Sequence, residues 1–527
     1  MNRRPNALLI LNDDMGFSDI GCYGGEVQTP NLNRLAENGL RFTQFYNTAR
    51  CSPTRASLLT GLHPHQTGIG ILVDDDGPEG YRGNLNERCV TMAEVLRAHD
   101  YRTYMSGKWH VAHDIAHQND TWPNQRGFEH FYGILAGAAN YYHPVTLTRD
   151  NVNIEHEATE QEDFYLTDAI SDNAVRYIHE HVKEHPNDPF FQYVAYTSPH
   201  WPLHAFEEDI VKYQGCFNAG WDRLREERLR RMVGMGMIDP AWKLTDRDPT
   251  QPPWEEVSDK TWQARRMEVY AAQIDRMDQG IGRVLDALEE TGQLENTLIF
   301  FLADNGGCAE EVQPSWADNM VSGRIARHKA KNGAPVAFGN VEGQMPGPEN
   351  TYQSYGIPWA NLSNTPFRLY KHWVHEGGIA TPLIVHWPKG LSDKGALRHT
   401  PGQLMDIMAT VLDVTGADYP KVYRDKPIPP CEGSSLAPLF QSDALERAPL
   451  FWEHEGNGAV RMGKWKLVKR YPGDWELYDL DEDRTERNDL ASAQPNLVKQ
   501  MAEAYQNWAE RCGVIPREKI LSIKHES

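Results

Sequence analysis

The chain has 527 residues, of which 40% are hydrophobic and 10% aromatic, including 15 tryptophans and 22 tyrosines. This composition excludes a disordered protein, and the length predicts two domains, or one large domain with an appendage. The net charge of −21, from 74 acidic and 53 basic residues, argues against nucleic acids and anionic membranes as partners, because both repel an acidic protein. An anionic substrate would therefore need a locally positive site.

The N-terminus, MNRRPNALLILNDDMG, runs from two arginines into a short apolar stretch that ends in acids. A signal peptide needs a longer apolar region and a small-residue cleavage site. No segment approaches the ~20 apolar residues of a membrane span. We therefore expect residues 7–12 to form a buried strand and the chain as given to be cytoplasmic. A chain that had lost a leader would be periplasmic or secreted instead.

Short apolar runs alternate with helical patterns along most of the chain. The runs occupy residues 7–12, 101–107, 190–197, 297–303 and 382–387. Runs of this length predict strands covered on both faces, as in a mostly parallel sheet. Between them, Thr91 opens TMAEVLRAH, and residues 263–291 repeat apolar side chains with a helical period. The pattern predicts an α/β fold in which helices sandwich a large, mostly parallel or mixed sheet.

The alternation of apolar runs and helical patterns is interrupted at residue 306 and ends after residue 440. Residues 306–364 are rich in Gly, Pro, Asn and Gln without a clear period, which predicts a long insertion loop in a catalytic domain of residues 1–440. Residues 441–527 are expected to form a smaller C-terminal domain. In it, AVRMGKWKLVKR and WELYDL, separated by YPGD, predict an antiparallel hairpin, and a helix is expected near residues 495–511.

Polar residues of catalytic type follow four of the predicted strands at once. They are Asp13-Asp14, Lys108-Trp109-His110, Ser198-Pro199-His200 and Asp304-Asn305. Ordinary strands also end in polar turns, but four such clusters together are less easily explained by chance. Because ligands bind at the carboxyl ends of strands in open α/β sheets, we expect these clusters to meet at one edge.

Asp13, Asp14, Asp304 and Asn305 offer only oxygen ligands. That set suits a hard cation, Ca²⁺ or Mg²⁺. Packed carboxylates repel one another, so a cation would also explain how the cluster is tolerated. The nearby histidines are better interpreted as hydrogen-bonding groups than as zinc ligands. The alternative is an Asp-rich turn that caps a helix.

The strongest local signal is CSPTRASLLTG, residues 51–61. Ser52 is a good N-cap and Pro53 a good first helical residue, which places Cys51 at the positive end of a helix, where anions bind. Arg55, one turn later, could reach back to the same place. On chemistry alone this is a thiol with a lowered pKa in an electropositive pocket. The seven cysteines are widely spaced without a CxxC pair, so most of them are expected to be buried thiols, and Cys89 and Cys308 are expected to be inert.

The CxPxR pattern followed by ASLLTG resembles the signature of the type I, formylglycine-dependent sulfatases of the alkaline phosphatase superfamily. Further segments resemble sulfatase blocks in family order: DDMGFSDIGCYGG, TPNLNRLAENGLRF, TGLHPHQTG, SGKWH, SPHWPLHA, ADNGG, PFRLYK, EGGIATPLIVHWPKG and, for the C-terminal sheet, WKLVKR…WELYDLDEDRTERNDLA. The likeness is greatest to bacterial arylsulfatases with a long insertion before PFRLYK. It implies an alkaline-phosphatase-like fold and hydrolysis of sulfate monoesters, either small aryl sulfates or sulfated saccharides. It also implies a formylglycine-generating maturation enzyme that oxidises Cys51.

The resemblance also implies a role for each site residue. Asp13, Asp14, Asp304 and Asn305 would hold a Ca²⁺ that also contacts the sulfate and the modified Cys51. Arg55 would steady the hydrated formylglycine, and Lys108 and Lys371 would bind sulfate oxygens. His110 would help to expel sulfate, His200 would protonate the leaving oxygen, and Asp304 would accept the proton of the attacking hydroxyl.

At Lys371 the family usually shows a longer, Gly-rich approach to EGG, so His372 or His375 could share its role. His63 and His65, in GLHPHQTG, are expected to be structural.

The segment GAANYYHP is expected to place Tyr141, Tyr142 and His143 near the mouth of the site. Their rings could stack on an aryl ring or a sugar, or they could be packing residues. The acidic run of residues 73–76 is a solvated loop or a binder of sugar hydroxyls. Two other functions remain open: a phosphonate or phosphate ester hydrolase of the same superfamily, and a non-catalytic anion-binding homologue with an unmodified Cys51.

Overall fold

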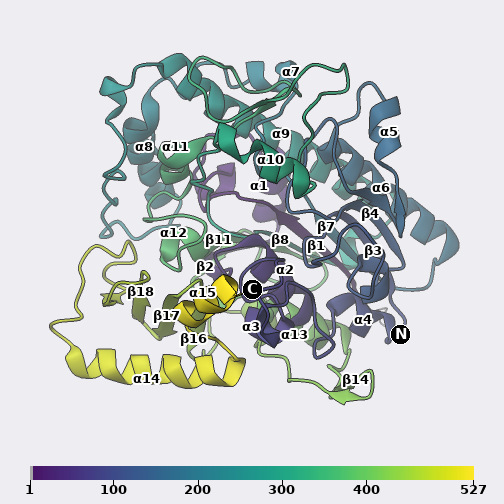
Figure 1. The fold of residues 1–527 in the computed structure, drawn as a ribbon. Coiled ribbons are helices and arrows are strands. Elements are labelled where there is room, and N and C mark those ends of the chain that lie inside the picture. The colour runs from purple at the N-terminus through teal and green to yellow at the C-terminus, as the bar shows by residue number, and fades with distance from the viewer. Residues whose placement is uncertain (1–3, 527) are drawn as a thin grey trace.

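A mixed sheet of 11 strands runs through the centre of the computed structural model, which describes residues 4–526 (Figure 1). From one edge to the other the strands are β12 (Ala396–Arg398), β2 (Leu40–Tyr46), β11 (Ala380–His386), β8 (Thr297–Ala303), β1 (Asn6–Asn12), β7 (Phe190–Ala195), β3 (Arg102–Lys108), β4 (His130–Ile134), β5 (Leu147–Arg149) and β6 (Val152–Asn153), with β13 (Gly402–Gln403) beside β2. The five strands from β8 to β4 are parallel, and β11 runs antiparallel to β8 and β2. All five predicted strands are present as β1, β3, β7, β8 and β11.

Helices cover both faces of this sheet, as the apolar runs predict. In β1, Leu8 and Ile10 join one hydrophobic cluster, and Leu9 and Leu11 join another. The first cluster includes α1 (Pro30–Glu37), α6 (Leu166–Glu184) and α9 (Lys260–Glu290). The second includes α2 (Cys51–Thr60), α4 (Met92–Arg97) and α13 (Met405–Thr415). The predicted α/β sandwich is therefore confirmed.

The predicted helix after Thr91 begins where the sequence places its cap. Thr91 caps α4 by accepting a hydrogen bond from the Glu94 N–H, and the Glu94 carboxylate accepts the Thr91 N–H in return. Apart from short 3-10 helices and the elements of the insertion, the remaining α-helices and strands between β1 and residue 440 are α3 (Pro64–Thr67), α5 (Glu155–Glu160), α7 (Glu207–Val211), α8 (Gly220–Gly234), α12 (Glu376–Ile379), β14 (Val422–Tyr423) and β15 (Lys426–Pro427).

The insertion of residues 306–364 is more ordered than the expected loop. It contains α10 (Ala317–Ser322), β9 (Ala337–Phe338), β10 (Thr351–Tyr352) and α11 (Gly356–Ser363). Its apolar residues Val312, Met320, Ala326 and Tyr352 form a small cluster of their own. Short elements of two to eight residues show too little periodicity to be recognised in a Gly- and Pro-rich sequence.

The C-terminal region holds a four-stranded antiparallel sheet, drawn in yellow-green beside α14 in Figure 1. Its elements are β16 (Leu450–His454), β17 (Asn457–Met462), β18 (Trp465–Lys469), β19 (Trp475–Asp479), α14 (Pro495–Cys512) and α15 (Arg517–Glu526). The run AVRMGKWKLVKR was expected to be one strand and is itself a hairpin, because Gly463 adopts a positive φ of 60° between β17 and β18. The predicted pairing with WELYDL is present as β18 and β19. The domain boundary after residue 440 stays a prediction.

A buried ion network joins the C-terminal sheet to the central sheet. Glu376 lies at its centre and accepts hydrogen bonds from Lys466 Nζ (2.9 Å), Arg484 Nε (2.8 Å) and the Tyr46 hydroxyl (3.0 Å). Lys466 also pairs with Glu486 at 2.8 Å.

Among residues 4–526, no helix combines the length and the apolar character that crossing a membrane requires.

Candidate active site

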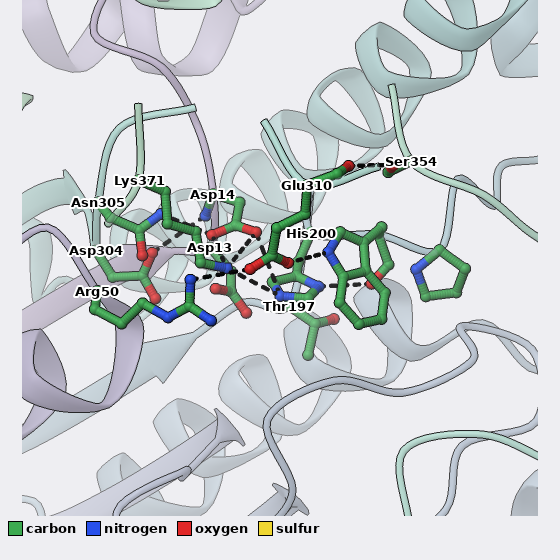
Figure 2. Close-up of polar contacts among 12 residues, drawn as sticks. Asp13, Asp14, Arg50, Thr197, His200, Asp304, Asn305, Glu310, Ser354 and Lys371 are labelled. Atoms are coloured by element: carbon green, nitrogen blue, oxygen red, sulfur yellow. Dashed lines mark hydrogen bonds and ion pairs between the residues drawn. The ribbon is translucent and has the colours of Figure 1, made fainter. Parts of the chain in front are cut away.

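Three of the four polar clusters that follow the predicted strands lie together in Figure 2, through Asp13, Asp14, His200, Asp304 and Asn305, and a hydrogen bond from Lys108 joins the fourth cluster to them. Pairing continues past the strand ends, because the Asp13 N–H donates to the Ser198 carbonyl and the Asp304 N–H to the Asn12 carbonyl, each at 3.1 Å. This extension brings the residues after β1, β7 and β8 within contact of one another. Lys108, the last residue of β3, donates from Nζ to Asp13 Oδ2 at 2.6 Å.

Three buried cations face three buried carboxylates in this cluster. Arg55 Nη2 lies 2.8 Å from Asp304 Oδ2 and 3.7 Å from Asp13 Oδ2. Lys371 Nζ donates to Asp14 at 2.9 Å. Lys108 supplies the third cation. The formal charges of these six side chains sum to zero, so the chain's own cations already offset the carboxylate repulsion that the sequence indicates.

The case for a metal ion rests on oxygens that the protein leaves unpaired. Among the residues that the structure describes, Asp13 Oδ1 and Asn305 Oδ1 are buried without a hydrogen-bond partner. Asn305 Nδ2 donates to Asp14 Oδ1 at 2.7 Å, which orients its amide oxygen. Asp13, Asp14 and His200 each offer a ligand atom, and these atoms lie within 4.8 Å of one another. Carboxylate and amide oxygens of this kind fit a hard divalent cation such as Ca²⁺.

The electrostatic environment differs between the carboxylates. Burial and the negative charge of Asp13 raise the pKa of Asp304 to about 7. Burial also opposes the ionisation of Asp14, but the positive charges of His200 and Lys371 outweigh it and hold the pKa of Asp14 well below its usual value. Asp14 is therefore a strong anionic centre, whereas Asp304 is poised to exchange a proton.

Cys51 is the first residue of α2, so the helix begins two residues earlier than predicted. Arg50 is the N-cap, and its carbonyl accepts the Thr54 N–H at 3.0 Å. Ser52, the expected cap, lies inside the first turn. The positive end of the helix dipole still falls at Cys51, as the sequence predicts. Arg55 donates from Nη1 to the Lys108 carbonyl at 3.0 Å and so connects α2 to the end of β3.

A cavity of about 390 Å³ opens onto Cys51, within the size range of small-molecule sites. Cys51, His110, His200 and Lys371 line it. Its other walls come from Arg50, Leu72, Val73, Asp74, Ala112, His113, Ile115, Leu135, Ala136, Gly137, Ala138, Trp201, Glu310, Ser322, Gly323, Arg324 and Ile325. The insertion therefore contributes one wall through residues 322–325, and Val73 and Asp74 of the acidic run reach the cavity.

The two catalytic-type histidines are held in different ways. His200 Nδ1 lies 2.6 Å from the Trp201 carbonyl, which turns Nε2 towards Lys371 Nζ at 3.5 Å and Asp14 Oδ2 at 3.3 Å. Burial lowers the pKa of His200 to about 4, although the charge of Asp14 opposes the shift. Burial and the charge of Lys108 lower the pKa of His110 well below its usual value. A Cβ at Gly137 would lie 2.5 Å from His110 Nε2, so glycine makes room for this ring.

Tyr141, Tyr142 and His143 do not line the cavity formed by the described residues, contrary to expectation. The Tyr141 hydroxyl donates to the carbonyls of Thr197 (2.8 Å) and His200 (2.9 Å), and so braces the loop that carries His200. Tyr142 packs on aromatic neighbours, with its ring 5.3 Å from that of Tyr165. The packing alternative therefore describes the two tyrosines, and residues 135–138, which precede them in the chain, line the cavity instead.

His372 and His375 point away from the cluster that Lys371 reaches. His372 Nδ1 lies 3.1 Å from Glu455, and His375 Nε2 lies 3.3 Å from Glu476. Neither contact supports the shared role considered for them.

His63 and His65 contact the C-terminal region, as expected of structural residues. The His63 ring lies 5.0 Å from that of Trp508, and His65 Nε2 lies 2.7 Å from Glu453. The thiols of Cys89 and Cys308 are buried, and burial raises the pKa of both.

The amino-acid sequence matches the family described as Sulfatase over residues 5–417. This chain belongs to the sulfatase family. Residues 367–510 also match the family described as the C-terminal part of N-sulphoglucosamine sulphohydrolase. Family membership makes the protein a sulfuric ester hydrolase.

Two curated relatives cover most of the sulfatase chain. An uncharacterized sulfatase of Schizosaccharomyces pombe is 32% identical over 98% of this chain and 95% of its own length. An arylsulfatase of Klebsiella aerogenes is 32% identical over 83% of this chain and 92% of its own.

Solved structures share the fold. One is i-CgsB in complex with a neocarrahexaose, with a TM-score of 0.67 and 24% identity over 96% of this chain and 93% of the other. Another, bound to its substrate D-glucosamine-2-N,6-O-disulfate, has a TM-score of 0.63 and 20% identity over 97% and 98% of the two chains.

Sequence reasoning missed the ion pair that forms part of the cavity wall of this sulfatase. Arg50 Nη1 lies 2.9 Å from Glu310 Oε1, and Trp201 Nε1 donates to Glu310 Oε2 at 2.9 Å (Figure 2). Arg50 could have been noticed as the neighbour of Cys51. Glu310 lies in an aperiodic segment, where nothing in the local pattern indicates that it folds back over the site.

We expect Tyr141→Phe to lower kcat for nitrophenyl sulfate roughly 5–30-fold. The change removes the hydroxyl that braces two carbonyls beside His200, and a lost hydrogen bond is worth about 1–2 kcal/mol. His143→Ala, outside the cavity, should change kcat less than about twofold. Steady-state assays of the two variants make the comparison, and an unchanged kcat in Tyr141→Phe would refute the bracing role.

Proposed function

We propose that this sulfatase hydrolyses sulfate monoesters of aryl or carbohydrate alcohols, with the help of Ca²⁺ and a formylglycine derived from Cys51. The observation that carries the proposal is the convergence of oxygen ligands and three cations beside the start of α2, next to the cavity that Cys51, His200 and Lys371 line. A chain of net charge −21 repels anions at long range. With a Ca²⁺ bound to its oxygen ligands, the convergence would offer the local positive charge that a sulfate ester needs.

Asp13, Asp14, Asp304 and Asn305 would hold the Ca²⁺, and the modified side chain of residue 51 would complete its surroundings. The unpaired Asp13 Oδ1 and Asn305 Oδ1 support this assignment, because buried acceptors usually have a partner. When bound, the ion supplies two positive charges that withdraw electron density from the sulfate and its transition state.

Lys108 and Lys371 would bind the sulfate oxygens from two sides. Both ammonium groups are buried and are already oriented by Asp13 and Asp14. Burial opposes the charge on Lys371, yet Asp14 outweighs that effect and keeps the pKa of Lys371 well above its usual value. Preoriented cations in a buried site stabilise developing negative charge without reorganisation.

A formylglycine hydrate at residue 51 would supply two hydroxyl groups, one as the nucleophile and one for release of the sulfate. Arg55 would steady this side chain from within α2. Asp304 would accept the proton of the attacking hydroxyl, a role that suits a carboxylate whose pKa is raised. His110, on the opposite wall, would assist sulfate release.

His200 would donate a proton to the leaving oxygen. Its Nδ1 is held by the Trp201 carbonyl, so the proton that it delivers is carried by Nε2, which faces the cavity. The low pKa of His200 means that the ring needs an additional anion nearby to be protonated. A bound sulfate ester provides that charge.

The remaining cavity walls suit a ring that also carries hydroxyl groups. Leu72, Ile115 and Ile325 are apolar, whereas Asp74 and Arg324 offer polar groups. Apolar walls with a few polar side chains are typical of sites for small organic ligands. The similarity to an arylsulfatase and to a structure with a sulfated glucosamine supports both aryl and saccharide leaving groups.

The nucleophile is tested by the mass of the peptide that contains residue 51, measured on active enzyme from its natural host. We expect the mass of formylglycine rather than that of Cys51, and a Cys51→Ala variant without activity. Active enzyme that carries only the unmodified thiol would remove the proposed nucleophile.

The acid role of His200 is tested by varying the leaving group. We expect His200→Ala to reduce kcat/KM about 10²–10⁴-fold for an alkyl or sugar sulfate, and much less for nitrophenyl sulfate, whose leaving group needs little protonation. His113→Gln, another histidine of the cavity wall, should affect both esters alike. Equal losses on both esters in His200→Ala would count against general-acid catalysis.

A further inference from the structure

A second group of metal-binding side chains lies outside the active site, where the catalytic region meets the C-terminal sheet. His372, His454 and Glu455 each present one ligand atom, and these atoms lie within 4.8 Å of one another. His372 Nδ1 is 3.1 Å from Glu455 Oε2, and the rings of His372 and His454 are 5.4 Å apart, nearly perpendicular at 83°. Four-coordinate Zn²⁺, with bonds of about 2.0–2.2 Å, separates its ligand atoms by about 3.3–3.6 Å.

His454 supplies an independent sign that something is bound here. It is the last residue of β16 and is 1% exposed. Its Nδ1 is buried and has no hydrogen-bond partner anywhere in the described chain. A buried ring nitrogen without a partner is unfavourable, whereas a metal ion would satisfy it. A neutral imidazole nitrogen is a common metal ligand.

We propose that His372, His454 and Glu455 form a second metal site, for a transition-metal ion of the Zn²⁺ class. Two imidazole nitrogens and one carboxylate oxygen favour such an ion over Ca²⁺, which prefers six to eight oxygens. Arg517 pairs with Glu455 Oε1 at 3.0 Å, so Glu455 binds the ion through Oε2 alone. A water molecule completes the usual four ligands.

The site joins two parts of the molecule that are far apart in the sequence. His372 follows Lys371, and its N–H donates to the Ala49 carbonyl at 2.7 Å, two residues before Cys51. Glu455 lies in the turn between β16 and β17. A bound ion therefore ties the segments that carry Lys371 and Cys51 to the C-terminal sheet. It acts on the active site by position and does not touch the substrate.

The test uses the full-length protein, stripped with a chelator, loaded with Co²⁺ as a visible probe and then desalted. We expect one Co²⁺ per chain, with the absorption of a tetrahedral site. His372→Asn and Glu455→Gln should weaken Co²⁺ binding by more than about 100-fold, beyond the usual effect of losing an outer partner. Asn suits position 372 because φ there is +91°, a region that Asn tolerates. Glu455→Gln keeps a partner for Arg517.

Two controls separate this site from other sites. His63→Gln removes a buried histidine outside the group and should leave Co²⁺ binding unchanged. Asp304→Asn should weaken Ca²⁺ binding at the active site and leave Co²⁺ bound, whereas His372→Asn should do the reverse. If Asp304→Asn did not weaken Ca²⁺ binding but the Co²⁺ results were as expected, that outcome would count against the proposed function and not against this site. Wild-type protein without stoichiometric Co²⁺, or Co²⁺ that persists in both His372→Asn and Glu455→Gln, would overturn the inference.

Discussion

The balance between three carboxylates and three cations governs the active site. Arg55, Lys108 and Lys371 neutralise Asp13, Asp14 and Asp304, so the buried cluster can exist without a metal ion. A neutral cluster offers little to an anion, however, and the whole chain is acidic. A divalent cation at the unpaired oxygens of Asp13 and Asn305 would change the local charge to +2, which a sulfate ester could bind. The proposed Ca²⁺ would therefore serve anion binding more than folding.

The fold creates that balance by topology. Parallel strands β1, β7, β3 and β8 end at the same edge, so residues more than 290 apart, such as Asp14 and Asn305, form a hydrogen bond. The first turn of α2 is inserted at this edge, and Arg55 connects it to β3 and to Asp304. Lys466 and Arg484 of the C-terminal region donate hydrogen bonds to Glu376, which lies only five residues from Lys371. These contacts fix the C-terminal sheet against the segment that carries Lys371. Rigid elements thus hold every charged group of the site.

Much of this arrangement could be predicted from the sequence, because buried parallel strands are encoded as continuous apolar runs. A polar residue that follows such a run must lie at the edge of the sheet where the parallel strands end. The exact start of α2 could not be predicted. Ser52 is a favourable N-cap residue, but the first backbone carbonyl that accepts a hydrogen bond within the helix belongs to Arg50. The role of Tyr141 could not be predicted either, because its hydroxyl donates to backbone carbonyls that come within reach only when the loop is folded. Glu310 contacts Arg50 across 260 residues without any local pattern. Long-range side-chain contacts are invisible to periodicity.

The central claim is tested most directly by the affinity of chelator-stripped protein for inorganic sulfate, measured by calorimetry with and without Ca²⁺. Because ligands that bind coupled sites raise each other's affinity equally, sulfate should bind at least about tenfold more tightly in the presence of Ca²⁺, and Ca²⁺ more tightly in the presence of sulfate. Equal sulfate affinity in both conditions would contradict the account, since the positive charge of the site would then not depend on the ion.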